Sequence, residues 1–180
     1  MRHSKLRLAL LFTLALPVLA QAHPGHDAGV GFAAGALHPL GGMDHLMALL
    51  AVGLLAGRMR GRAAGAIVAA YMGLSGVGVV VGFAGVQLIF MQAAIFTSVI
   101  ACAVLAAVPP RRLPLATAAS IGLFALFHGN AHGYEAAAGI DRSYYACGLM
   151  MTSAMIITLA AWAAVVAAPR AGQWRVFQPR

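Results

Sequence analysis

The stretch that decides the fold is His38-Pro-Leu-Gly-Gly-Met-Asp-His45, which interrupts a long apolar segment. A second stretch, Phe127-His-Gly-Asn-Ala-His-Gly-Tyr-Glu135, ends another apolar segment. Together they hold four of the seven histidines and two of the four acidic residues of the chain. Ionisable side chains are costly within a bilayer and usually mark a functional site or pathway there. These two stretches are therefore the first candidates for function.

The composition is that of a membrane protein. Of the 180 residues, 62% are hydrophobic and 9% are charged, with a mean hydropathy of +0.86, whereas soluble domains carry about 25% charged residues. The net charge of +8 comes from arginines in short clusters between apolar runs. Because no basic stripe is interleaved with aromatic residues, we exclude a nucleic-acid partner and expect a lipid bilayer instead. The positive charge indicates which loops face the cytoplasm.

The N-terminus has the pattern of a targeting segment. Arg2, Lys5 and Arg7 precede the apolar run 8–19, and Ala20-Gln-Ala22 is a cleavage signal of the A-x-A type. We predict that residues 1–22 are a signal peptide that is removed, because the apolar run is short for a membrane span. An uncleaved signal anchor is the alternative. Export across the inner membrane of a bacterium follows, with segment 23–28 in the periplasm.

The rest of the chain predicts an all-α integral membrane protein, a bundle of about five transmembrane helices. A helix of about 20 residues crosses the hydrocarbon core, and no alternating strand pattern competes. The expected transmembrane domain covers residues 29–168, and a cytoplasmic tail covers residues 169–180. The predicted spans are 29–57 (interrupted by the His-Pro-Leu-Gly-Gly break), 63–82, 86–108, 113–133 and 144–168.

The arginines predict the orientation. With a periplasmic N-terminus and a cytoplasmic C-terminus, only Arg142 of the arginines after the signal peptide faces outward. This distribution obeys the positive-inside rule at every loop. The arginines expected inside are Arg58, Arg60, Arg62, Arg111, Arg112, Arg170, Arg175 and Arg180.

Small and aromatic residues predict how the helices pack. The pairs Gly61-x-x-x-Gly65 and Gly78-x-x-x-Gly82 permit close backbone approach; packing within the bundle is favoured over a dimer interface, and a homo-oligomer stays open. Cys102 and Cys147 are expected to be buried packing residues without a disulfide. Four aromatic residues near helix ends are expected to be interfacial anchors: Tyr144, Tyr145, Trp162 and Trp174.

The spacing of the histidines predicts a metal site. His38 and His45 are seven residues apart, almost two helical turns, with Asp44 to one side. Because Pro39 and Gly41-Gly42 lie between them, we expect a helix to start or bend there. His128, His132 and Glu135 follow one another at i, i+4 and i+7 and share a stripe. Imidazole and carboxylate together suit zinc, nickel, cobalt, copper or iron.

The predicted topology brings the two stretches to the same depth. The first span enters the membrane from outside near His38, and the fourth reaches the outside near Glu135, so one shared site is expected. Cleavage after Ala22 would expose His23, whose α-amine and ring form a chelate, with His26 nearby to help capture an ion. A disordered tail with incidental histidines is the alternative.

These motifs resemble those of the HupE/UreJ family of nickel/cobalt permeases, accessory proteins of hydrogenase and urease gene clusters. Its first signature, His-Pro-x-x-Gly-x-Asp-His, is matched by residues 38–45, and its second by residues 127–135. The resemblance covers essentially the whole chain. It implies uptake of nickel or cobalt, with hydrogenase or urease maturation proteins as partners. It carries over six metal-binding positions: His38, Asp44, His45, His128, His132 and Glu135. The separate nickel/cobalt transporter family has His-x4-Asp-His, one residue shorter than the spacing here.

We therefore expect an inner-membrane permease, not an enzyme, that moves Ni²⁺ or Co²⁺ from periplasm to cytoplasm and holds no resident cofactor. Spacing and depth predict a buried metal site, and only the resemblance predicts nickel or cobalt. Two alternatives stay open. A haem b electron carrier would use histidines on two helices, although carboxylates suit an ion better than a porphyrin. An intramembrane zinc-dependent hydrolase would use the same ligand types.

Overall fold

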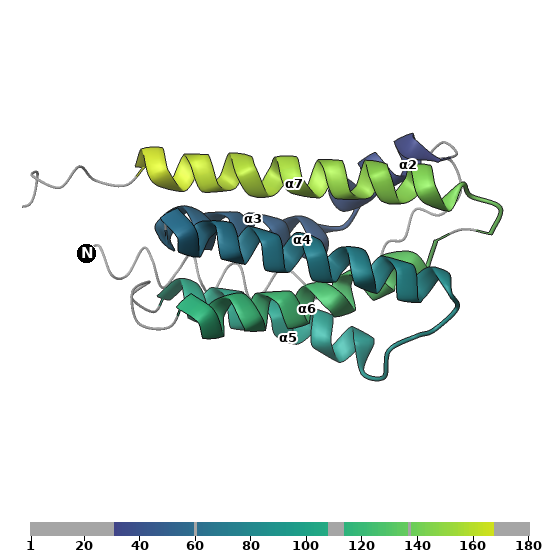
Figure 1. Ribbon diagram of the computed structural model, residues 1–180, viewed down its shortest axis with the longest axis horizontal. Coiled ribbons are helices and arrows are strands. Elements are labelled where there is room, and N and C mark those ends of the chain that lie inside the picture. Colours follow the sequence, from purple (N-terminus) through teal and green to yellow (C-terminus); the bar gives the residue numbers. More distant parts are fainter. Residues whose placement is uncertain (1–30, 60, 108–113, 137, 168–180) are drawn as a thin grey trace, which may run out of the picture.

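The computed structural model describes residues 31–59, 61–107, 114–136 and 138–167. All regular secondary structure in these ranges is helical (Figure 1). The predicted signal peptide, segment 23–28, the tail 169–180 and Trp174 lie outside the described residues. The helices are α2 (Phe32–Gly41), α3 (Met43–Met59), α4 (Gly61–Phe83), α5 (Met91–Ala107), α6 (Pro114–Tyr134) and α7 (Arg142–Ala167).

The expected break in the first apolar segment is a sharp bend. α2 and α3 meet at an angle of 84° around Gly42, whose backbone is extended. Pro39 lies within α2, where its missing N–H and its ring disturb the helix, so α2 ends two residues later. A Cβ at Gly42 would overlap the side chains of Asp44 and His45. The bend therefore lies at the break that contains Pro39 and Gly42, and His38 and His45 lie on two helices instead of one helical face.

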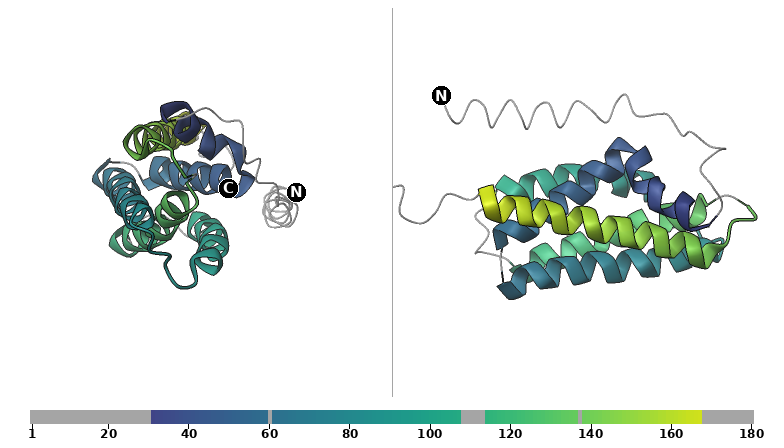
Figure 2. Two further views of the ribbon diagram at one scale, coloured as in Figure 1. Left: turned by 90° about the vertical axis from the view of Figure 1, so that its right-hand side faces the viewer. Right: turned by 90° about the horizontal axis from the view of Figure 1, so that it is seen from above.

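Close helix crossings divide the bundle into two halves. α4 packs along α6 over most of its length, whereas α2 and α3 pack mainly on α7 (Figures 1 and 2). We call α4 with α6 the first half and α2, α3 and α7 the second half. α5 contacts both α3 and α6.

Glycines permit these crossings. In the first half, Gly78 and Gly82 face the backbone of α6, while Gly129 and Gly133 face the backbone of α4. The prediction for Gly78-x-x-x-Gly82 is thus confirmed. The favoured prediction for Gly61-x-x-x-Gly65, packing within the bundle, is wrong for the described ranges, because no neighbouring helix there comes within 4 Å of a Cβ built at either glycine. The dimer alternative for this pair stays a prediction.

The second half is built the same way from other glycines. Gly35 of α2 and Gly148 of α7 each face the other helix's backbone, and Gly53 and Gly57 of α3 face α7. Both arms of the bent segment are therefore held against one long helix.

Membrane spans are identified by length and composition. α4 and α7 are long and apolar enough to cross a membrane, and α2 with α3 makes a third crossing if the bent pair is one span. α6 has 21 residues but carries His128, Asn130 and His132. The described helices thus give two or three candidate spans, and the count of five stays a prediction.

Side-chain exposure corrects two expectations. Tyr144 is exposed, as an interfacial anchor would be, but Tyr145 is only 3% exposed and faces the interior. Cys102 is buried as expected, whereas Cys147 lies exposed on α7. Tyr145 fails as an anchor because the neighbouring position on a helix points about 100° away.

Candidate metal centre

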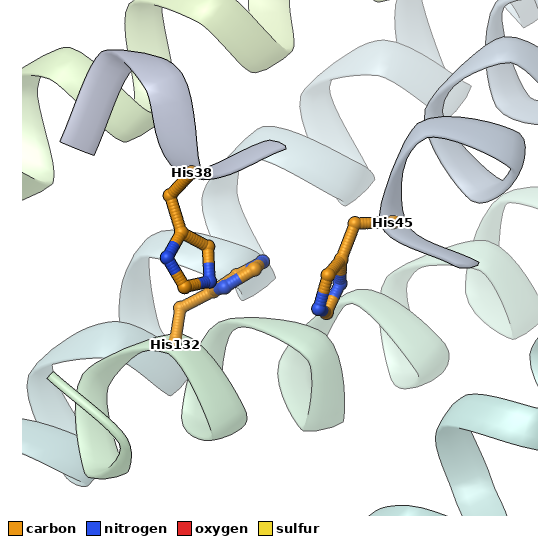
Figure 3. Close-up of side chains that lie close together, drawn as sticks. All are labelled: His38, His45 and His132. Atoms are coloured by element: carbon orange, nitrogen blue, oxygen red, sulfur yellow. The ribbon is translucent and has the colours of Figure 1, made fainter. Parts of the chain in front are cut away.

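Three histidines from both halves of the bundle converge. His38 comes from α2, His45 from α3 and His132 from α6 (Figure 3). One ring nitrogen from each lies within 4.8 Å of the other two. The centroid of the His132 ring is 4.7 Å from that of His38 and 4.4 Å from that of His45. We call these three residues the histidine triad.

The triad can hold a single first-row metal ion once its rings close in. A nitrogen ligand lies about 2.1 Å from such an ion, so three nitrogens spread evenly around one ion are about 3.4–3.6 Å apart. Nitrogens that are separated by up to 4.8 Å therefore need to approach one another by up to about 1.4 Å.

The local sequence explains how the triad assembles. The bend at Gly42 turns α3 away from α2, so His38 and His45 approach His132 from two sides (Figure 3). His132 lies in the last turn of α6 and is only 5% exposed. Its Nδ1 has no hydrogen-bond partner among the described residues. A buried polar atom of this kind is rare unless a ligand satisfies it.

His128 lies beside the triad, one helical turn earlier on α6. Its ring centroid is 5.0 Å from that of His45 and 6.0 Å from that of His132. It is 2% exposed, and its Nε2 has no hydrogen-bond partner in the described part of the chain. The structure thus places His128 next to the triad but not within the group of nitrogens that lie within 4.8 Å of one another.

The two carboxylates lie differently. Asp44 Oδ2 is 3.9 Å from His45 Nε2, and the Asp44 side chain is 37% exposed. Glu135 lies just past the end of α6 and is exposed, where its Oε1 accepts a hydrogen bond of 3.4 Å from Gln92 Nε2. Neither belongs to the group of three. His23 and His26 fall outside the described residues.

Sequence reasoning missed two residues at this site. Tyr145 places its ring centroid 5.9 Å from that of His38, and its hydroxyl is buried with no hydrogen-bond partner in the described ranges. Asn130, fully buried between the two histidines of α6, holds the α4–α5 loop. Its Oδ1 accepts a hydrogen bond from the Leu88 N–H at 2.9 Å, and its Nδ2 donates to the Val86 carbonyl at 2.8 Å. The available signal for Asn130 was an amide inside an apolar segment.

Comparison with known proteins identifies relatives. Residues 10–178 match the family described as HupE / UreJ protein. The chain is also 32% identical over 173 residues to Protein HupE from Rhizobium leguminosarum bv. viciae, covering 96% of this chain and 90% of that protein. No solved structure matches the chain. The match extends over the bent segment and over the helix that carries His128 and His132, and the chain belongs to the HupE/UreJ family.

Proposed function

We propose that this protein is an inner-membrane permease that takes up Ni²⁺ or Co²⁺ from the periplasm to the cytoplasm for metalloenzyme maturation. Membership of the family implies an accessory role in nickel or cobalt uptake. The observation that carries the proposal for this chain is the convergence of His38, His45 and His132, with one ring nitrogen of each within 4.8 Å of the other two. Three neutral imidazoles suit borderline first-row cations and disfavour Mg²⁺ and Ca²⁺, which prefer oxygen ligands.

The proposal includes the topology predicted from the sequence. Five spans follow a cleaved signal peptide over residues 1–22, the N-terminal segment 23–28 with its two histidines captures the ion, and the tail 169–180 lies in the cytoplasm. The bend and the C-terminal end of α6 then face the periplasmic side. Hydrogenase or urease maturation proteins receive the metal inside.

The geometry supports a stepwise passage. The hydrated cation exchanges water for the triad nitrogens, while the carboxylate of Asp44, 3.9 Å from His45, offsets part of its charge. Passage requires binding that is favourable enough to admit the ion and weak enough to release it. His128, one turn further inward on α6, offers the next nitrogen.

The triad favours an ion over haem. Bis-histidine haem needs two imidazoles on opposite faces of a wide ring, whereas here three imidazoles point at one another (Figure 3). Three histidines also occur in catalytic zinc sites. Zinc-stimulated hydrolysis of lipid or peptide by the purified protein would support the hydrolase alternative, and its absence together with metal uptake would support the permease.

Uptake of radioactive nickel and cobalt by cells that lack other uptake systems tests the proposal. Loss of even a supporting residue around a metal typically costs about 10–100-fold in affinity, so His45→Ala and His132→Ala should each reduce uptake at least about tenfold. Leu123→Ala, an exposed position on α6, is the control and should match wild type. Equal uptake by all four proteins, at equal membrane abundance, would contradict the proposed function.

A further inference from the structure

A small cavity lies directly inward of the triad, among α3, α4, α5 and α6. His128 lines it together with three other polar side chains, Tyr71, Ser98 and Cys102. All four are buried, at 2% exposure for His128, Ser98 and Cys102 and 5% for Tyr71. The remaining wall is apolar and includes Val52 and Phe124.

The order of residues along the helices fixes the depth of this cavity. Ala48 and Val52, which line it, lie one and two turns past His45 on α3. On α6, Phe124 and His128 line it, and His132 is one turn further out. The cavity therefore follows the triad on the path from the bend toward the other end of the bundle. His128 belongs to both places, since its ring also lies 5.0 Å from that of His45.

A residue that lines the cavity has an unsatisfied polar atom. His128 Nε2 is buried and has no hydrogen-bond partner among the described residues, and burying such an atom is unfavourable unless a ligand satisfies it. The hydroxyl of Ser98 already donates to the Ile95 carbonyl at 2.6 Å, so its oxygen can still accept or coordinate. An occupant that accepts electron pairs would satisfy the imidazole nitrogen and use the oxygen and sulfur atoms around it.

The chemistry of the lining selects the class of occupant. Within the described ranges no acidic residue lines the cavity, so a divalent cation there needs another source of negative charge. The Cys102 thiol can supply it, because a thiol loses its proton to a coordinated transition metal. Thiolate and imidazole together favour first-row transition-metal cations over Mg²⁺ and Ca²⁺.

We propose that this cavity is a second, inner transit site for the transported transition-metal cation, with Cys102 Sγ and His128 Nε2 as ligands and the hydroxyls of Tyr71 and Ser98 as supporting oxygen donors. The inference rests on the proposed function and adds a step to it. The ion leaves the triad through His128, binds the Cys102 thiolate while the thiol proton passes to solvent, and then moves on toward the cytoplasm.

Cobalt spectroscopy of the purified full-length protein tests the ligand assignment. Co²⁺ bound to a thiolate gives a sulfur-to-cobalt charge-transfer band that nitrogen and oxygen ligands do not give. We expect this band in wild type and in the control variant Cys147→Ser, because Cys147 is exposed on α7. The band should disappear in Cys102→Ser. Absence of the band in wild type, or its persistence in Cys102→Ser, would overturn the inference.

Uptake measurements separate the inference from the proposed function. Cys102→Ala should lower nickel and cobalt uptake about tenfold, by analogy with the loss of other metal-site residues, whereas Cys147→Ala should transport like wild type. Tyr71→Phe, which keeps the ring, is a second variant and should lower uptake less than Cys102→Ala does. Wild-type uptake in both Cys102→Ala and Tyr71→Phe, with uptake lost in His132→Ala, would refute the inner site alone. No uptake by wild type would refute the proposed function.

Discussion

At the scale of single residues, the two carboxylates of the signature stretches have different surroundings. Asp44 lies in the first turn of α3, 3.9 Å from a nitrogen of His45. Glu135 lies beyond the end of α6 and accepts a hydrogen bond from Gln92 on α5. The two carboxylates are therefore expected to contribute unequally to metal binding.

Exchange of each carboxylate for its amide tests this difference. Asp44→Asn should weaken binding of Ni²⁺ or Co²⁺ to the purified protein about tenfold, a modest loss because Asp44 is partly exposed and its charge is screened. Glu135→Gln should change the affinity less than about threefold, since exposed charges contribute little. Titration calorimetry measures both. A larger loss for Glu135→Gln than for Asp44→Asn would contradict this assignment.

The sequence predicted that histidines of both stretches share one site, but it did not predict which three of them lie within 4.8 Å of one another. Glu135, the third member of the i, i+4, i+7 stripe, comes directly after the last residue of α6 and is exposed, and its side chain contacts Gln92 of α5. The position of Tyr145 near a helix end predicts an interfacial anchor, and only the packing of α7 against α2 shows that its side chain points inward. Helix ends and rotations are tertiary properties that spacing alone does not determine.

At the scale of elements, the α4–α6 crossing depends on glycines that face backbone. A Cβ at Gly78 would overlap the backbone of α6 at Leu126 and Asn130, and it could be accommodated only by separating the helices. Gly73 lies on the same helix with nothing in the described ranges within 4 Å of such a Cβ. The two positions make a matched pair.

We expect Gly78→Ala to destabilise the protein by about 1–3 kcal/mol, the usual cost of overpacking. Gly73→Ala should leave stability unchanged or raise it by up to about 1 kcal/mol, because alanine favours helices. Thermal unfolding in detergent, followed by circular dichroism, compares the two with wild type. Equal midpoints for both variants would mean that the close approach of α4 and α6 does not limit side-chain size at this crossing.

The same comparison shows where sequence reasoning about elements succeeds. Pro39 and Gly42 predicted an interruption, and the bend lies there. The angle of 84° was not predictable, because it is set by the packing of α2 and α3 on α7 through Gly35, Gly53 and Gly148. A GxxxG pattern likewise identifies a glycine pair that permits close packing, but it does not show that another helix packs there. Gly61-x-x-x-Gly65 is such a pair, with no helix of the described ranges packed against it.

At the scale of the whole molecule, the arginine distribution predicts the orientation in the membrane. Arg142, which the prediction places outside, lies at the start of α7, with its guanidinium carbon 5.7 Å from the centroid of the Phe83 ring at the end of α4. These two helix ends therefore lie at the same end of the bundle, as the predicted orientation requires.

A fluorescent protein fused after Arg180 should fluoresce, because it folds in the cytoplasm, and alkaline phosphatase fused there should be inactive. The opposite pair of results would reverse the orientation.

The division of the bundle into two halves has a thermodynamic consequence. The triad takes His38 and His45 from one half and His132 from the other, so a bound ion links them and adds its binding free energy to their cohesion. At a free-ion concentration about one hundred times Kd, mass action stabilises the folded protein by about 2.7 kcal/mol. Ni²⁺ or Co²⁺ should thus raise the melting temperature of the wild-type protein by several degrees. Mg²⁺ should leave the wild-type melting temperature unchanged, and Ni²⁺ should leave that of His132→Ala unchanged. In the proposed transporter, the cargo is then a structural component of the loaded state, and its release would loosen the interface between the two halves.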